Sequence, residues 1–211
     1  MKTIQLDKLT NLLLFTKETL RQLEENNDRL DFNIKYWLKK GKIITLKKGL
    51  YVLKEKWERE INKDDYRQYL ANQLYQPSYL SCEYVMSKYG LLTEGVFGIT
   101  SMTTKTTKAF VNDLGSFNYY SVSPALFLGY EVKKAGSFPI AIAKKSKAVF
   151  DFLYLRFLKN TPINKKIIEE LRINWENMTK EEFREIINYA GKTKSVRLKQ
   201  VINLIINTYA S

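Results

Sequence analysis

The stretch that decides the fold is residues 29–53, which read RLDFNIKYWLKKGKIITLKKGLYVL. Its first half predicts a helix from about Arg29 to Lys40, whose apolar face would carry Leu30, Ile34, Trp37 and Leu38 at helical spacing. Gly41 can adopt the left-handed backbone that ends such a helix. The period then changes to that of β-strands, and the predicted strand, turn and strand are residues 42–46, 47–49 and 50–53.

Two shorter helices are predicted before this stretch. The first is indicated by four leucines at helical spacing: Leu6, Leu9, Leu12 and Leu13. Thr16 is a typical N-cap for the second, which would turn Leu20 and Leu23 inward. Three helices followed by a tight hairpin is the order of a winged helix-turn-helix. In that architecture the third helix enters the major groove of DNA and the hairpin reaches the flanking backbone.

The charge of the chain is strongly positive and locally concentrated. Lys and Arg number 35 against 22 Asp and Glu, a formal net charge of +13. An excess of this size favours nucleic acid or an anionic membrane surface as the partner. We expect nucleic acid and no membrane, because the hairpin gives the apolar face of the third helix a core to join. Two stretches lack acidic residues, 32–54 and 186–211. The first follows directly after several acidic residues, so its charge is a local feature, and it is the better candidate for a binding surface.

The candidate DNA-binding residues lie on the predicted third helix, away from its apolar stripe, and on the hairpin. The Asn33 amide donates and accepts side by side, which suits an adenine edge. The lysines suit backbone phosphates, and Lys47 and Lys48 are expected at the tip of the wing. The full set is Arg29, Asn33, Lys35, Tyr36, Lys39, Lys40, Lys42, Lys47 and Lys48. The alternative is that these side chains form only a solvated surface.

Residue counts exclude several kinds of chemistry. The chain has no histidine and one cysteine, Cys82. It therefore has no Ser-His-Asp or Cys-His catalytic group, no internal disulfide and no cysteine-based zinc site. Cys82 is predicted to be a small buried side chain in the first turn of a helix. Neither a membrane span nor a secretory leader is expected, so we expect a cytoplasmic protein. Since no catalytic group stands out in the sequence, we also expect a protein that is not an enzyme and needs no cofactor.

The first domain is predicted to cover residues 1–56, and residues 57–211 are predicted to form an α+β domain with a mainly helical tail. A helix is expected over 64–75, and Asp64 and Asp65 suit its first turn because of the helix dipole. A further helix follows Pro77 and ends at Gly90. The expected strands are 99–104, 108–111, 117–121 and 138–142.

The predicted tail begins with a helix that carries residues 149–155. Thr179 and Glu182 form a capping box for the next helix, which stops at Gly191, and a last helix runs from about Ser195 to Tyr209. The hydroxyl- and lysine-rich run 103–108 can bind an anion or form a solvated strand edge.

Several motifs of this chain occur in an order that resembles a known family. They are the hairpin 41–51 and the later segments 79–84, 89–91, 99–105, 117–120 and 148–155. Together they resemble AbiEi-type antitoxins, the transcriptional-regulator half of type IV toxin–antitoxin systems that act in abortive phage infection. The resemblance covers about residues 6–160, and its weight lies in the order of loose motifs.

The resemblance implies a repressor that binds inverted repeats in its own promoter, with two copies on the DNA. It also implies that the C-terminal domain counteracts a nucleotidyltransferase toxin without forming a stable complex with it. The hairpin and third-helix residues correspond to the family's DNA-binding surface. Two alternatives stay open: a winged-helix regulator without a toxin partner, and a metal-dependent nuclease that uses scattered carboxylates.

Overall fold

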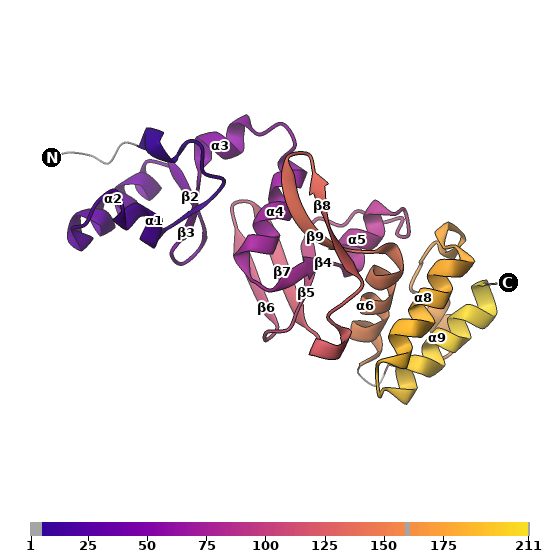
Figure 1. Cartoon of the computed structure of the whole chain (residues 1–211). Coiled ribbons are helices and arrows are strands. Elements are labelled where there is room, and N and C mark those ends of the chain that lie inside the picture. The colour runs from indigo at the N-terminus through magenta and orange to yellow at the C-terminus, as the bar shows by residue number, and fades with distance from the viewer. Residues whose placement is uncertain (1–5, 159–160, 211) are drawn as a thin grey trace.

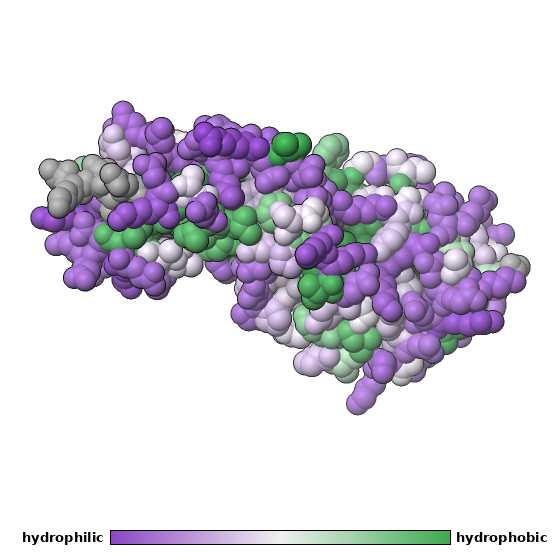
Figure 2. Space-filling view, turned by 45° about the horizontal axis from the view of Figure 1, so that its top comes forward, coloured by the Kyte–Doolittle hydropathy of each residue, from purple (hydrophilic) through white to green (hydrophobic). Residues whose placement is uncertain are grey.

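The chain folds as an α+β protein, as predicted, in a computed structural model that describes residues 6–158 and 161–210 (Figure 1). A small three-stranded sheet lies near the N-terminus, a six-stranded sheet follows, and helices form the C-terminal end. Hydrophilic side chains cover most of the face in Figure 2, with separate smaller hydrophobic areas between them. Residues 1–5, which bear on the expected lack of a leader, lie outside the described ranges.

The first elements form what we call the N-terminal unit, residues 6–53. They are η1 (Leu6–Leu9), β1 (Phe15–Thr16), α1 (Lys17–Arg21), α2 (Asn27–Lys39), β2 (Ile43–Lys47) and β3 (Leu50–Leu53). The sheet order is β1-β3-β2, and both strand pairs are antiparallel. The predicted third helix, hairpin strands and Thr16 cap are confirmed, and the Thr16 hydroxyl accepts from the Thr19 amide at 3.2 Å.

Three details of this prediction were wrong. The first helix is only a 3-10 turn, because the chain must extend to pair Phe15 with Tyr51 in the sheet. Leu23 is exposed, because α1 ends at Arg21 and helical spacing no longer applies to it. Leu38 is also exposed, since it follows buried Trp37 by one residue and therefore lies about 100° further around the helix.

The β2–β3 hairpin is buried on both of its faces. Residues on one face, Ile43, Tyr51 and Leu53, pack in a small core with Leu30, Ile34 and Trp37 of α2. Residues on the other face belong to the large core of the remaining chain: Ile44, Leu46, Leu50 and Val52. Alternate side chains of a strand point to opposite faces, so one short hairpin contributes to two cores.

The six-stranded sheet has the order β6-β7-β5-β4-β9-β8. Its strands are β4 (Ser78–Leu80), β5 (Ile99–Thr103), β6 (Lys108–Asn112), β7 (Gly115–Ser121), β8 (Tyr130–Ala135) and β9 (Phe138–Ala143). α4 (Lys63–Leu74) packs on one face, while α5 (Cys82–Lys88) and α6 (Lys145–Phe157) lie on the other (Figure 1). This arrangement makes β6 and β8 the two edges.

Helical elements complete the chain. They are α3 (Lys54–Arg59), η2 (Pro124–Leu126), α7 (Lys165–Glu169), η3 (Trp175–Asn177), α8 (Lys180–Gly191) and α9 (Val196–Tyr209). The capping box of Thr179 and Glu182 and the last helix are confirmed. Within the described ranges, no helix is both long and apolar enough to span a membrane.

Some elements of this part were not predicted. The point where we predicted the boundary between the two domains, after residue 56, lies inside helix α3. Two i,i+4 ion pairs support this helix, Lys54–Glu58 and Glu55–Arg59. Strand β4 is only three residues long, too short to show an alternating pattern. Strand β8 is an exposed edge strand whose charged side chains hide its strand character.

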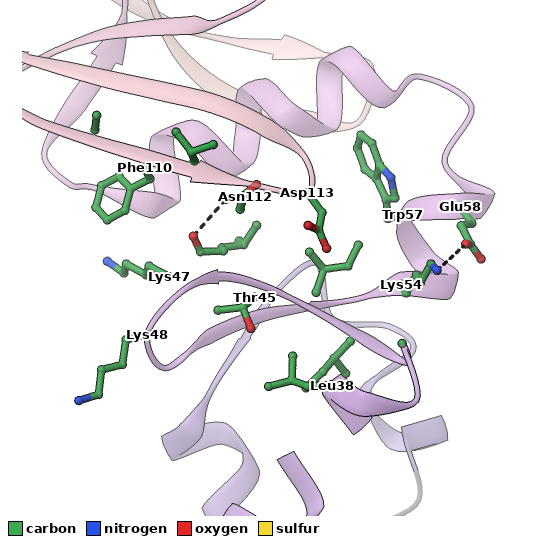
Figure 3. A pocket seen from close by; sticks show the side chains of 16 residues that line it. Leu38, Thr45, Lys47, Lys48, Lys54, Trp57, Glu58, Phe110, Asn112 and Asp113 are labelled. Atoms are coloured by element: carbon green, nitrogen blue, oxygen red, sulfur yellow. Dashed lines mark hydrogen bonds and ion pairs between the residues drawn. The ribbon is translucent and has the colours of Figure 1, made fainter. Parts of the chain in front are cut away.

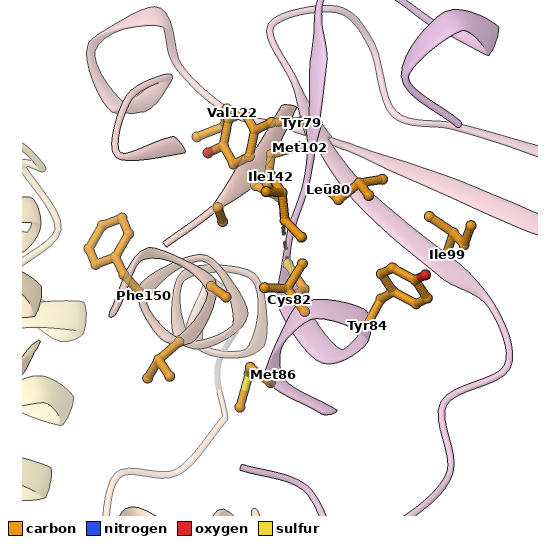
Figure 4. Packing of buried hydrophobic residues seen from close by; sticks show 14 of the residues in the cluster. Tyr79, Leu80, Cys82, Tyr84, Met86, Ile99, Met102, Val122, Ile142 and Phe150 are labelled. Atoms are coloured by element: carbon orange, nitrogen blue, oxygen red, sulfur yellow. Dashed lines mark hydrogen bonds between the residues drawn. The ribbon is translucent and has the colours of Figure 1, made fainter. Parts of the chain in front are cut away.

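The large core contains Cys82, whose side chain is fully buried, as predicted (Figure 4). Its Sγ lies 3.7 Å from the Met102 sulfur. Burial, with the Asp151 charge, raises the pKa of the thiol well above its usual range. Cys82 is therefore a packed, protonated side chain.

A fully buried ion pair crosses the same core. Lys147 Nζ donates to Asp151 Oδ1 at 2.6 Å, and neither side chain is accessible. The other carboxylate oxygen accepts from the Tyr79 hydroxyl at 2.9 Å and the Ser81 hydroxyl at 2.7 Å. These contacts tie α6 to β4 and satisfy a charge that would be very costly to bury alone.

We predict that Lys147→Met lowers the free energy of unfolding by about 3 kcal/mol or more, because it leaves Asp151 buried without its counter-charge. Urea unfolding measures this change. Lys199→Met, at an exposed position of α9, is the matched control and should change stability by less than about 0.5 kcal/mol. An equal effect of the two substitutions would show that the buried pair does not support the core.

Candidate nucleic-acid interface

The solvent-facing side of α2 is basic in its C-terminal half. Lys35 and Lys39 are exposed and stand four residues apart, so they share one face of the helix. Phe32, 55% exposed, precedes them on that face. Tyr36 and Lys40 are exposed beside it, with the Lys40 ammonium 6.0 Å from the centre of the Tyr36 ring.

Asn33 does not lie on this face. Its side chain is only 4% exposed, so the expectation that it points toward solvent and can reach an adenine edge is wrong. Asn33 follows Leu30 by three residues and precedes Trp37 by four, which places it on the buried stripe of α2. The predicted set of DNA-binding residues did not include Phe32. Its spacing of three from Lys35 and four from Tyr36 places it on the solvent-facing side of the helix.

The N-terminal half of α2 carries acidic as well as basic side chains. Arg29 is exposed, but Asp28 and Asp31 are exposed in the same turns. Asp31 accepts from Lys17 of α1 at 2.5 Å, and this hydrogen bond is the main reason that its pKa lies below the ordinary value. The net positive surface of α2 therefore begins at Lys35 and continues past the helix end to exposed Lys42.

The two lysines at the hairpin tip, Lys47 and Lys48, differ in burial. Lys48 is exposed, as expected for a wing tip. Lys47 is partly buried and donates to the Leu74 carbonyl at the end of α4, at 2.7 Å. That carbonyl has no partner within its helix, so a cation there is favourable. Lys47 therefore lies beside the tip, as predicted, with its ammonium bound to the end of α4.

Lys47 instead joins a group that we call the lysine cluster, which contains Lys47, Lys105 and Lys108. The ammonium groups of Lys105 and Lys108 lie over the ring of Tyr75, at 5.4 and 5.8 Å from its centre. Burial lowers the pKa of Lys47, and the charges of Lys108 and Lys105 lower it further. From the sequence, residues 103–108 were predicted to bind an anion or to form a solvated strand edge. Their proximity to the hairpin was not predicted.

An open groove of about 890 Å³ separates the hairpin from strand β6 (Figure 3). Both walls are edge strands, because β2 and β6 each end a sheet. Asn112 bridges them by donating to the Leu46 carbonyl at 3.0 Å. In Figure 3, Lys47 and Lys48 extend at one end of this groove and the Lys54–Glu58 pair lies at the other.

The residues that the structure describes contain no group of three His, Cys, Asp or Glu side chains suited to a metal ion. Asp64, one of the adjacent aspartates in α4, accepts from Lys88 at 2.7 Å and from the Tyr84 hydroxyl at 2.9 Å. Burial acts to raise the pKa of Asp64, but these two hydrogen bonds outweigh it and hold the pKa below its ordinary value. Asp64 is therefore an ionised anchor between α4 and α5.

Comparison with models of known protein families and with curated protein sequences finds no match for this chain.

The hairpin turn depends on Gly49, which has φ +80. We predict that Gly49→Ala costs about 1–2 kcal/mol in the free energy of unfolding, because an L-residue is strained in this backbone conformation. Beyond the two neighbouring residues, no atom lies within 4 Å of the added Cβ, so the cost is conformational and not steric.

Gly191→Ala is the matched control, since the added Cβ there also meets open space but the residue is helical. It should be neutral or stabilise by up to about 1 kcal/mol. Thermal or urea unfolding compares the two variants. Equal changes in the free energy of unfolding at the two positions would contradict a left-handed backbone conformation at Gly49.

Proposed function

We propose that this chain is a DNA-binding transcriptional regulator whose first 56 residues act as a winged helix-turn-helix. The observation that carries the proposal is the basic outer side of α2, where Lys35 and Lys39 face solvent beside exposed Tyr36. The 3-10 turn η1 and the helices α1 and α2 precede a hairpin with exposed Lys48 at its tip, and the proposal assigns to α2 the role of the third helix of a winged helix-turn-helix.

In this proposal α2 lies in the major groove and its lysines contact phosphates at the groove walls. Each lysine that neutralises a phosphate releases condensed counterions, which makes binding strongly dependent on salt. Phosphate contacts carry no sequence information, so base reading falls on Phe32 and Tyr36. Phe32 can pack against a thymine methyl, and the Tyr36 hydroxyl can donate or accept a hydrogen bond.

The biological role that we propose with it rests on the resemblance to AbiEi-type antitoxins. The protein represses its own promoter from the cytoplasm, with two copies on inverted repeats, and counteracts a nucleotidyltransferase toxin without a stable complex. A toxin reading frame directly downstream, whose growth arrest this chain relieves on co-expression, is the expected result. Absence of such a reading frame supports the alternative of a regulator without a toxin partner.

We predict that Lys35→Ala/Lys39→Ala weakens binding to the protein's own upstream DNA and lowers the salt slope by up to about two units, one for each lost phosphate contact. Both side chains are exposed, so the fold should be unaffected. Fluorescence anisotropy at several salt concentrations measures both quantities, on the upstream duplex and on a random duplex of equal length.

Lys165→Ala/Lys166→Ala on α7 removes the same charge from an exposed surface and should leave binding near that of the parent. The parent should prefer the upstream duplex over the random one. Equal binding of the parent to both duplexes, with no loss in the α2 variant, would overturn the proposal.

A further inference from the structure

The lysine cluster gathers three cations from separate parts of the chain. Lys47 comes from β2, Lys108 begins strand β6, and Lys105 lies in the turn before it. None of the three forms an ion pair with a carboxylate in the part of the chain that the structure describes. The cluster is therefore a local concentration of uncompensated positive charge.

The fold holds these lysines together by contacts that do not neutralise them. Lys47 uses one of its three ammonium protons on the Leu74 carbonyl, which leaves two for another acceptor. Tyr75, the residue after Leu74, donates its hydroxyl to the Thr106 carbonyl at 3.2 Å and so fixes the turn that carries Lys105. Its ring also faces the ammonium groups of Lys105 and Lys108.

Three like charges held this close repel one another, and a bound anion removes that repulsion. Lys105 and Lys108 are exposed, and Lys47 is partly exposed, so an extended anion can reach all three. The two segments that supply the charges come from the two sides of the groove in Figure 3. Exposed Lys48 follows Lys47 directly and continues the positive surface toward the hairpin tip.

We propose that the lysine cluster binds a backbone phosphate of the same DNA duplex that α2 contacts, so that the second part of the chain is also a DNA-binding surface. This inference rests on the proposed function and extends it beyond the first 56 residues. The hairpin contributes to both surfaces, because Lys47 belongs to the cluster and exposed Lys48 lies at the tip. DNA bound in this way spans the groove and contacts the edge strand β6.

The matched variants are Lys105→Ala/Lys108→Ala on the β6 edge and Lys133→Ala/Lys134→Ala on β8, the opposite edge of the same sheet. All four side chains are exposed, and each variant removes two positive charges. Anisotropy titrations of the full-length variants use the upstream duplex and a random duplex, each at several salt concentrations. The α2 variant Lys35→Ala/Lys39→Ala is measured beside them.

We expect the salt slope of the β6-edge variant to be lower than that of the parent by about one unit for each lost phosphate contact. A contact that contributes nothing at 1 M salt then contributes a factor of about eight in affinity at 0.1 M, and the variant should bind more weakly than the parent by this factor. The loss should be equal on the two duplexes, because phosphates carry no sequence information. The β8 variant should match the parent on both.

A β6-edge variant that binds like the β8 variant, while the α2 variant is weakened, would overturn this inference and leave the proposed function standing. A parent that does not prefer its upstream duplex, and whose α2 variant is unchanged, would overturn both. Circular dichroism of each variant confirms that the fold is intact before its binding is interpreted.

Discussion

The burial of the β2–β3 hairpin on both faces is the constraint on which the rest of the structure depends. One set of alternate side chains packs against α2, and the other set joins the core of the six-stranded sheet. A two-stranded hairpin is marginally stable by itself, so the two cores that flank it are what hold its register. Both the orientation of α2 and the position of the hairpin tip follow from this arrangement.

This constraint connects the fold to the proposed DNA surface. Helix α2 packs on one face of the hairpin, and the six-stranded sheet lies beyond the other face (Figure 1). The exposed lysines of α2 therefore lie on the side of the helix that faces away from the hairpin. Because the other face packs on the larger core, the hairpin tip is brought to the end of α4, where Lys47 meets the Leu74 carbonyl. The same packing brings β6 near the hairpin, and a single amide of Asn112 bridges the two edge strands. Lys47 and Lys48 of the hairpin and Lys54 of α3 thereby line the groove between the two edge strands.

The N-terminal unit could be predicted well because its signals are local. Gly41, the Thr16 cap and the change from helical to alternating spacing each act within a few residues. Asn33 was misplaced because a polar side chain was taken to face solvent, although its spacing from Leu30 and Trp37 places it on the buried stripe. The lysine cluster could not be predicted, since Lys47 and Lys105 are brought together only by tertiary packing. The same holds for the Lys147–Asp151 pair, whose partners Tyr79 and Ser81 are distant in sequence.

The most direct test of this account is the reactivity of every lysine toward an acylating reagent, measured by mass spectrometry on the full chain with and without its upstream duplex. The chain itself supplies the controls, because exposed lysines also occur on β8 and α7. We expect DNA to protect Lys35, Lys39, Lys48, Lys105 and Lys108. The reactivity of Lys133, Lys134, Lys165 and Lys166 should be unchanged. Protection of the second group without the first, or no protection by DNA at any lysine, would contradict it.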